Sequence, residues 1–321
     1  MNVGKNKGRG GFTLVEMLVV IAIVAILAAI IIPAGNMALR ASRRAANGFE
    51  ISQLIAGIER YKAENGGVYP PSFGEAPFGG TYATSFTAGT WRNTLLGRYV
   101  QKAYPKASNR DIAYLFTEVA DQLDQSSALP FWLNQTSADA RYPFTGPVKR
   151  SYFAMDERQL GTITTIPGSA TATPAIPDLP LYGFRPKHAG ESYYIYIESR
   201  HYPMHVNAVL SSDHAGSPRL AAGTGAARLP EASVRPWLRV NLVDASSINL
   251  NNYINGDSFQ LHSAGLDGRF CANHDDLRKF PCGDTGLNFA GQPLPYDDFV
   301  DDRDNQTNFS EGNSIDSVPV Q

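Results

Sequence analysis

Carboxylate side chains are concentrated near the C-terminal end of this 321-residue chain. Five of them lie within eight residues, at Asp297, Asp298, Asp301, Asp302 and Asp304. Calcium binds about six to eight oxygen ligands and tolerates loops of carboxylates, amides and carbonyls, so a run of this kind can hold it. With few cations nearby, the charges would repel one another without a counter-ion. The alternative is a solvated acidic tail, which is the usual meaning of such a run.

The chain contains two cysteines, Cys271 and Cys282, in a polar stretch rich in glycine and aspartate. In an exported protein, two cysteines this close in sequence are typical of one disulfide that closes a small loop. Two free thiols are the alternative. A metal site is less favoured because only two cysteines are available, although His274 lies between them.

A further carboxylate lies inside an apolar segment at the other end of the chain. From Phe12 to Ile32, only Thr13 and Glu16 interrupt the apolar residues. As a helix this segment spans about 32 Å at ~1.5 Å per residue, which is enough to cross a bilayer core. An isolated carboxylate on such a helix costs roughly 2.5–3.5 kcal/mol. Glu16 therefore needs a compensating partner, unless its carboxylate lies at the membrane surface.

The residues before this segment are short, glycine-rich and basic, with Lys5, Lys7 and Arg9 among them. This charge predicts that the N-terminus stays in the cytoplasm and that the rest of the chain is exported. A cleaved secretory signal is the simpler alternative, with a cleavage site in "AILAA". The position of Glu16 argues against it, and so does a helical pattern that continues beyond Pro33.

A second apolar stripe follows at helical spacing, at Leu54, Ile55, Ile58 and Tyr61. The sequence Asn65-Gly66-Gly67 is a strong helix stop. Together these patterns predict one helix from about residue 13 to 65. Its first half is apolar all round and its second half is amphipathic. Pro33 and Gly35 are the expected points of bending or local unwinding.

The stretch "GGFTLVEMLVVIAIVAILAAIIIP" resembles the cleavage and methylation segment of type IV prepilins and type II secretion pseudopilins. Gly11 matches the residue before the cut, and Phe12 matches the new N-terminus, which the prepilin peptidase also methylates. Glu16 matches the acidic residue at the fifth mature position, and Pro33 the proline at the twenty-second. The resemblance implies that Glu16 pairs with the cationic amine of Phe12 in a neighbouring subunit. Such a pair would offset the cost of the buried carboxylate and set the register between helices.

Beyond the helix, the sequence predicts an exported head of the α+β class. Helical patterns cover 91–100 and 108–125, the second with Ser108 as its N-cap. Aromatic and β-branched residues predict strands at 151–155, 192–199, 237–243 and 257–263. Two stretches rich in small residues and proline, 161–180 and 214–236, are interpreted as surface loops. The expected fold is pilin-like: a long N-terminal helix, an antiparallel β-sheet head, and extra helices and loops.

The segments "LHSAGLDGRF" and "YDDFVDDRDNQTNFSEG" resemble the C-terminal calcium-binding loop of major pseudopilins. The matching residues are Ser263, Gly265, Asp267, Gly268, Asn308 and Phe309. The chain departs from the family pattern at Cys271, where a glycine is expected, and at Asp304-Asn305, where an acidic pair is expected. The expected calcium ligands are Asp267, Asp302 and Asp304, with Asp297 and Asp298 as weaker candidates.

Together the resemblances imply a structural subunit of a membrane-anchored helical filament and no enzyme. We expect a leader peptide at 1–11, a membrane-spanning and assembly helix at 12–65, and a head at 66–321 whose acidic loop region covers 257–316. The implied apparatus is similar to a type II secretion system. The alternatives are a minor type IV pilus subunit with an adhesive head, which the large head favours, and an exported binding protein or enzyme anchored by this segment.

The resemblance also implies the partners and the location. The partners are other pilin-like subunits, which bind through the N-terminal helix, the prepilin peptidase, the assembly platform of the inner membrane and the lipid bilayer. No nucleic acid is expected, because the net charge is −2. The protein is expected to span the inner membrane once, with its head in the periplasm, before it is extracted into a periplasmic or surface filament.

Overall fold

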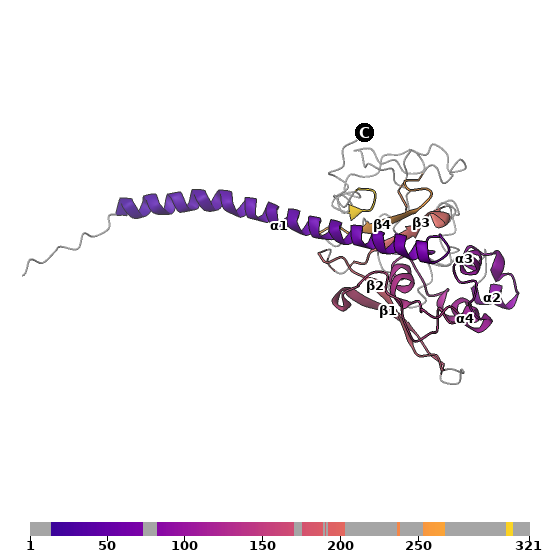
Figure 1. Cartoon of the computed structure of the whole chain (residues 1–321). Helices are drawn as coiled ribbons and strands as arrows, with labels where there is room; N and C mark the ends of the chain where they lie inside the picture. Colours follow the sequence, from indigo (N-terminus) through magenta and orange to yellow (C-terminus); the bar gives the residue numbers. More distant parts are fainter. Residues whose placement is uncertain are drawn as a thin grey trace, which may run out of the picture. The chain divides into compact units, whose positions relative to one another are not determined.

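A computed structural model of the chain describes residues 14–72, 82–169, 175–188, 190, 192–202, 236–237, 253–266 and 306–310. The chain divides into two compact units, Met1–Arg43 and Arg44–Gln321. The described part of the first unit is entirely helical and belongs to helix α1 (Leu14–Glu64), which is drawn in Figure 1 as the long indigo ribbon. Helix α1 confirms the helix predicted from about residue 13 to 65. It stays helical through Pro33 and Gly35, so the local unwinding expected there is absent.

In the second unit, α1 buries one stripe of apolar side chains. Ile51, Leu54, Ile58 and Tyr61 recur three or four residues apart and are at most 1% exposed. The helix ends at Glu64, and the side-chain amide of the next residue, Asn65, donates to the carbonyl of Tyr61 at 2.8 Å. The two glycines that follow adopt positive φ angles of 76° and 69°, the conformation that favours glycine after a helix. The predicted stop signal is therefore confirmed.

Short helices follow α1 along the chain and form part of the core. They are α2 (Tyr82–Thr87), the 3₁₀ turn η1 (Trp91–Asn93), α3 (Leu95–Ala103), α4 (Asn109–Tyr114), the π-helical turn η2 (Leu115–Val119), α5 (Ala128–Pro130) and the π-helical turn η3 (Phe131–Gln135). The hydroxyl of Ser108 accepts a hydrogen bond from the backbone of Asp111 at 3.2 Å, which confirms the predicted N-cap of α4. Both helical predictions for this region are thus confirmed, and the second helix continues from α4 into the wider π-helical turn η2.

Five described strands form two small antiparallel sheets. In the first, β1 (Leu160–Ile166) pairs with β2 (Leu179–Phe184). In the second, the order is β3 (Ile195–Glu198), β4 (Phe259–Ser263) and β5 (Gln306–Thr307). The remaining described elements are the 3₁₀ turns η4 (Glu157–Gln159) and η5 (Ser199–His201). The predicted α+β, pilin-like fold is confirmed.

Two details of the sequence interpretation are wrong. The stretch 161–180, expected to be a surface loop, supplies β1 and the start of β2, because its threonines and isoleucines pair across a hairpin. The stretch 151–155, expected to be a strand, forms none. Tyr152 instead makes one backbone bond to Leu133 at 3.0 Å, and its ring packs edge-on against Tyr61 at 5.0 Å. The strand predicted at 237–243 lies, apart from Trp237, outside the described residues.

The core of the second unit is unusually aromatic. The ring of Trp132 is fully buried and meets Tyr61, Tyr99 and Phe144 edge-on, with centroids 5.2–6.5 Å apart. The hydroxyl of Tyr61 is hydrogen-bonded to that of Tyr99 and, at 2.6 Å, to that of Tyr104. Buried hydroxyls that bond to one another satisfy their polar atoms without water. This cluster joins α1 to the short helices and gives the head a single core.

Candidate membrane, assembly and calcium-loop sites

The first half of α1 exposes its apolar side chains on every side. The exposed fraction is 80% for Leu14, 65% for Ile21 and 64% for Ile32. Within the described residues, α1 is the one helix whose length and apolar composition suffice to cross a membrane. Monomeric soluble proteins rarely expose apolar patches of this extent, so this surface is suited to lipid or to other helices. Glu16 lies in the first turn of the described helix and is also exposed.

Several residues singled out in the sequence lie outside the described residues. These are the processing residues Gly11 and Phe12, the cysteines Cys271 and Cys282, and the carboxylates Asp267, Asp297, Asp298, Asp302 and Asp304. The cleavage site, the disulfide and the calcium ligands therefore stay predictions. Among the residues that the structure does describe, no three His, Cys, Asp or Glu side chains are grouped to hold a metal ion.

The structure does bring together the two halves of the predicted calcium-loop motif. Ser263, at the end of β4, pairs with Gln306 in β5. Asn308 secures this junction: its side-chain oxygen accepts from the backbone N–H of Leu261 at 2.9 Å, and its side-chain nitrogen donates to the carbonyl of Phe259 at 3.1 Å. Its own N–H donates to the carbonyl of Leu261 at 3.1 Å. The asparagine of the motif thus forms three hydrogen bonds with the backbone of β4.

A buried histidine lies in the same junction. His262 pairs with Thr307, and its ring meets that of Phe309 edge-on, with centroids 6.0 Å apart. Burial lowers the pKa of His262 to about 3, because the cationic ring would lose its hydration without gaining a partner. Its Nε2 atom is buried and has no hydrogen-bond partner. His262 is therefore a neutral side chain within the sheet.

A second polar cluster fastens the strands to α1. One carboxylate oxygen of Glu50 accepts from the side-chain amide of Gln159 at 2.8 Å. The other accepts from the hydroxyl of Tyr194 at 2.8 Å and from the backbone N–H of Lys187 at 3.2 Å. Burial and the nearby carboxylate raise the pKa of Tyr194, so it stays a donor. Glu50 thus ties the segments that flank β1, β2 and β3 to one position on the helix.

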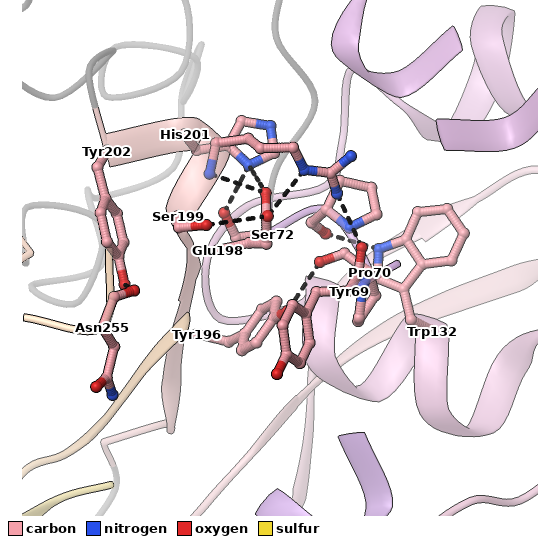
Figure 2. Close-up of polar contacts among 12 residues, drawn as sticks. Tyr69, Pro70, Ser72, Trp132, Tyr196, Glu198, Ser199, His201, Tyr202 and Asn255 are labelled. Carbon is pink, nitrogen blue, oxygen red and sulfur yellow. Dashed lines mark hydrogen bonds and ion pairs between the residues drawn. The ribbon is translucent and has the colours of Figure 1, made fainter. Parts of the chain in front are cut away.

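A third cluster, shown in Figure 2, lies at the end of β3 and includes a serine, a histidine and a glutamate. The Nδ1 atom of His201 is 3.1 Å from the hydroxyl of Ser72 and 3.4 Å from a carboxylate oxygen of Glu198. These residue types also form hydrolytic triads, in which the carboxylate and the hydroxyl bind opposite ring nitrogens. Here both bind Nδ1, and all three residues are at most 2% exposed. The arrangement is that of a buried structural network.

Further hydrogen bonds in Figure 2 connect this part of the structure to the backbone of the segment that follows α1. Arg200 bonds to Glu198 at 2.8 Å and donates to the backbone carbonyl of Tyr69 at 2.9 Å. The hydroxyl of Tyr196 donates to the carbonyl of Pro70 at 2.8 Å, and the indole of Trp132 to that of Pro71 at 2.8 Å. The segment that leaves α1 is therefore fixed through its backbone. Sequence analysis missed this cluster, because it joins residues 69–72 to Trp132 and to residues 196–201, which are 61 to 131 positions away.

The prokaryotic N-terminal methylation motif matches residues 6–32. This motif is the signature of type IV prepilins and pseudopilins, and the apolar first half of α1 fits it. The chain therefore carries the N-terminal methylation motif found in pilin-like proteins, and its long helix with small antiparallel sheets is an α+β, pilin-like architecture. Comparison with curated proteins and with solved structures gives no match.

Proposed function

We propose that this protein is a structural subunit of a helical filament anchored in the inner membrane, in an apparatus similar to a type II secretion system. The observation that carries the proposal is the exposed apolar half of α1, which coincides with the methylation motif. The other half of the same helix buries one apolar stripe in the head. One half is thus available for lipid and for neighbouring subunits, while the other supports a folded domain. The head lies in the periplasm in this proposal.

Processing and assembly follow from the motif. The prepilin peptidase cuts between Gly11 and Phe12 and methylates the new amine of Phe12. In the filament, the carboxylate of Glu16 pairs with the amine of Phe12 from a neighbouring subunit. Such a pair offsets the roughly 2.5–3.5 kcal/mol that an isolated carboxylate costs within a bilayer. The proline at Pro33 lies within the helix and removes one backbone donor from it.

The experiment compares the full chain with its Glu16→Ala variant, each co-expressed with a prepilin peptidase and an assembly platform. Mass spectrometry measures cleavage and methylation, and cross-linking followed by electron microscopy measures filaments. We expect the variant to be cut and methylated but to form no filament. A Glu59→Ala variant, which removes an exposed carboxylate from the head half of α1, is the control and should assemble. Normal incorporation of the Glu16 variant into filaments would refute the proposed pairing.

A calcium ion bound by the acidic loop region is a further part of the proposal. It is supported by the β4–β5 junction, which holds the two halves of the motif together. Asp267, Asp302 and Asp304 are the proposed ligands, and a disulfide between Cys271 and Cys282 closes a loop within the same segment. Calcium would raise the melting temperature of the head, because it binds the folded loop. A thermal melt that excess chelator leaves unchanged would contradict this part.

A minor type IV pilus subunit with a binding head is the second candidate. The size of the expected head, residues 66–321, favours it. Deletion of the gene separates the two functions. Loss of protein secretion with surface pili intact supports the secretion apparatus. Loss of pilus-dependent adhesion with secretion intact supports the pilus.

A further inference from the structure

Two arginines follow the apolar half of α1 on the same helix. Arg40 and Arg43 are three residues apart, which places both on one face, and both are exposed. Arg40 comes directly after Leu39, which is 58% exposed, and Met37 is 72% exposed. The apolar surface therefore continues as far as Leu39. Neither arginine makes an ion pair with another residue in the described part of the chain.

The helix geometry places these charges relative to a membrane. The exposed apolar surface from residue 14 to 39 covers about 39 Å at ~1.5 Å per residue, which exceeds the ~30 Å of a hydrocarbon core. Glu16 and Arg40 are separated by about 36 Å along the helix axis. This separation lies between the hydrocarbon thickness of ~30 Å and the ~40–45 Å of the whole bilayer. One position of the helix therefore places Glu16 in one headgroup layer and Arg40 in the other.

The direction of the Arg40 and Arg43 side chains also favours contact with the headgroup layer. In an α-helix, side chains lean toward the N-terminus, so those of Arg40 and Arg43 lean back toward the apolar half. Side chains that lean this way from a position beyond the apolar half point toward the headgroup layer. A guanidinium group binds phosphate through two parallel hydrogen bonds and keeps its charge at any physiological pH. Both arginines are thus suited to lipid phosphates.

We propose that Arg40 and Arg43 form a binding site for anionic phospholipid headgroups, which sets the depth of the unassembled subunit in the membrane. The proposal rests on the membrane-spanning role of α1. Before assembly, the bound phosphates hold the helix so that Glu16 lies in the opposite headgroup layer, where its charge stays hydrated. The cost of bringing this carboxylate into an apolar environment then arises only on assembly, when the amine of a neighbour is available.

The test uses the full chain with phosphatidylcholine vesicles, with and without phosphatidylglycerol. Flotation measures insertion, and native mass spectrometry in detergent measures which lipids remain bound. We expect the wild type to insert into both vesicles and to retain phosphatidylglycerol over phosphatidylcholine. A basic residue near an anionic surface contributes about 1 kcal/mol, so Arg40→Gln/Arg43→Gln should lose roughly 30-fold in this preference. The Arg40→Lys/Arg43→Lys variant keeps both positive charges and should retain most of the preference for phosphatidylglycerol.

A matched control removes the same charge from the head. Arg98 and Lys106 are exposed in the second unit, and Arg98→Gln/Lys106→Gln should keep the full preference. Equal loss in both double variants, an unchanged preference in the Arg40/Arg43 variant, or displacement of the lipid by inorganic phosphate at equal concentration would overturn the proposal. Failure of the wild type to float with either vesicle would instead refute the membrane-spanning role. The two failures are therefore distinguishable.

Discussion

Acid should destabilise the head through one of its buried histidines, His262. His262 lies within the three-stranded sheet, is 2% exposed and has a pKa lowered to about 3 by burial. In the unfolded chain a histidine has a pKa of about 6.5. Between these two values, the unfolded state binds a proton that the folded state does not. The free energy of unfolding therefore falls as the pH decreases from about 6.5 toward 3.

The size of this effect follows from the difference between the two pKa values. Each pH unit costs about 1.4 kcal/mol while one proton separates the two states. Over the whole interval the loss is on the order of 5 kcal/mol, which is comparable with the total stability of many domains. Other groups contribute to the same curve. Burial raises the pKa of Asp111, for example, which stabilises the folded state at lower pH and so acts in the opposite direction.

The difference in the free energy of unfolding between the wild type and a His262 variant isolates the contribution of this histidine, because the contributions of all other titratable groups cancel. We expect His262→Gln and His262→Leu to abolish the part of the pH dependence that His262 causes. Denaturant unfolding of the full chain in detergent, measured at several values between about pH 6.5 and 4, gives the free energies. The wild type should lose about 1.4 kcal/mol per pH unit more than either variant. Parallel curves for all three proteins would refute the reasoning that burial keeps this ring neutral.

Three further substitutions test individual contacts of the head by thermal and denaturant unfolding. Glu50→Ala removes the acceptor of three hydrogen bonds and should cost about 2–4 kcal/mol, and an unchanged melting temperature would contradict its role in fastening the strands. Asn308→Ala should cost about 2–3 kcal/mol and speed amide exchange at Leu261, whereas unaltered exchange would argue against the junction described above. Gly97→Ala places a Cβ atom 1.9 Å from the backbone carbonyl of Trp91 and should cost at least about 3 kcal/mol, so a well-tolerated alanine would contradict this packing.

The local features of the chain were predictable from the sequence. The limits of α1 follow from an apolar run, an amphipathic stripe and an Asn-Gly-Gly stop, and each of these acts over a few residues. The N-cap at Ser108 and the strands β3 and β4 were also anticipated. The hairpin of β1 and β2 was missed, because a stretch rich in threonine, alanine and proline resembles a loop until its partner strand is known.

The contacts that hold the head together could not be predicted, because they join residues far apart in the chain. Ser72 and His201 are separated by 129 positions, and Glu50 and Tyr194 by 144. No local periodicity marks such pairs, and only folding brings them together. The sequence by itself determined the apolar segment, its methylation motif and the length of the helix, since these depend on near neighbours. The tertiary structure alone decided which polar groups are buried together, because burial depends on how distant segments pack.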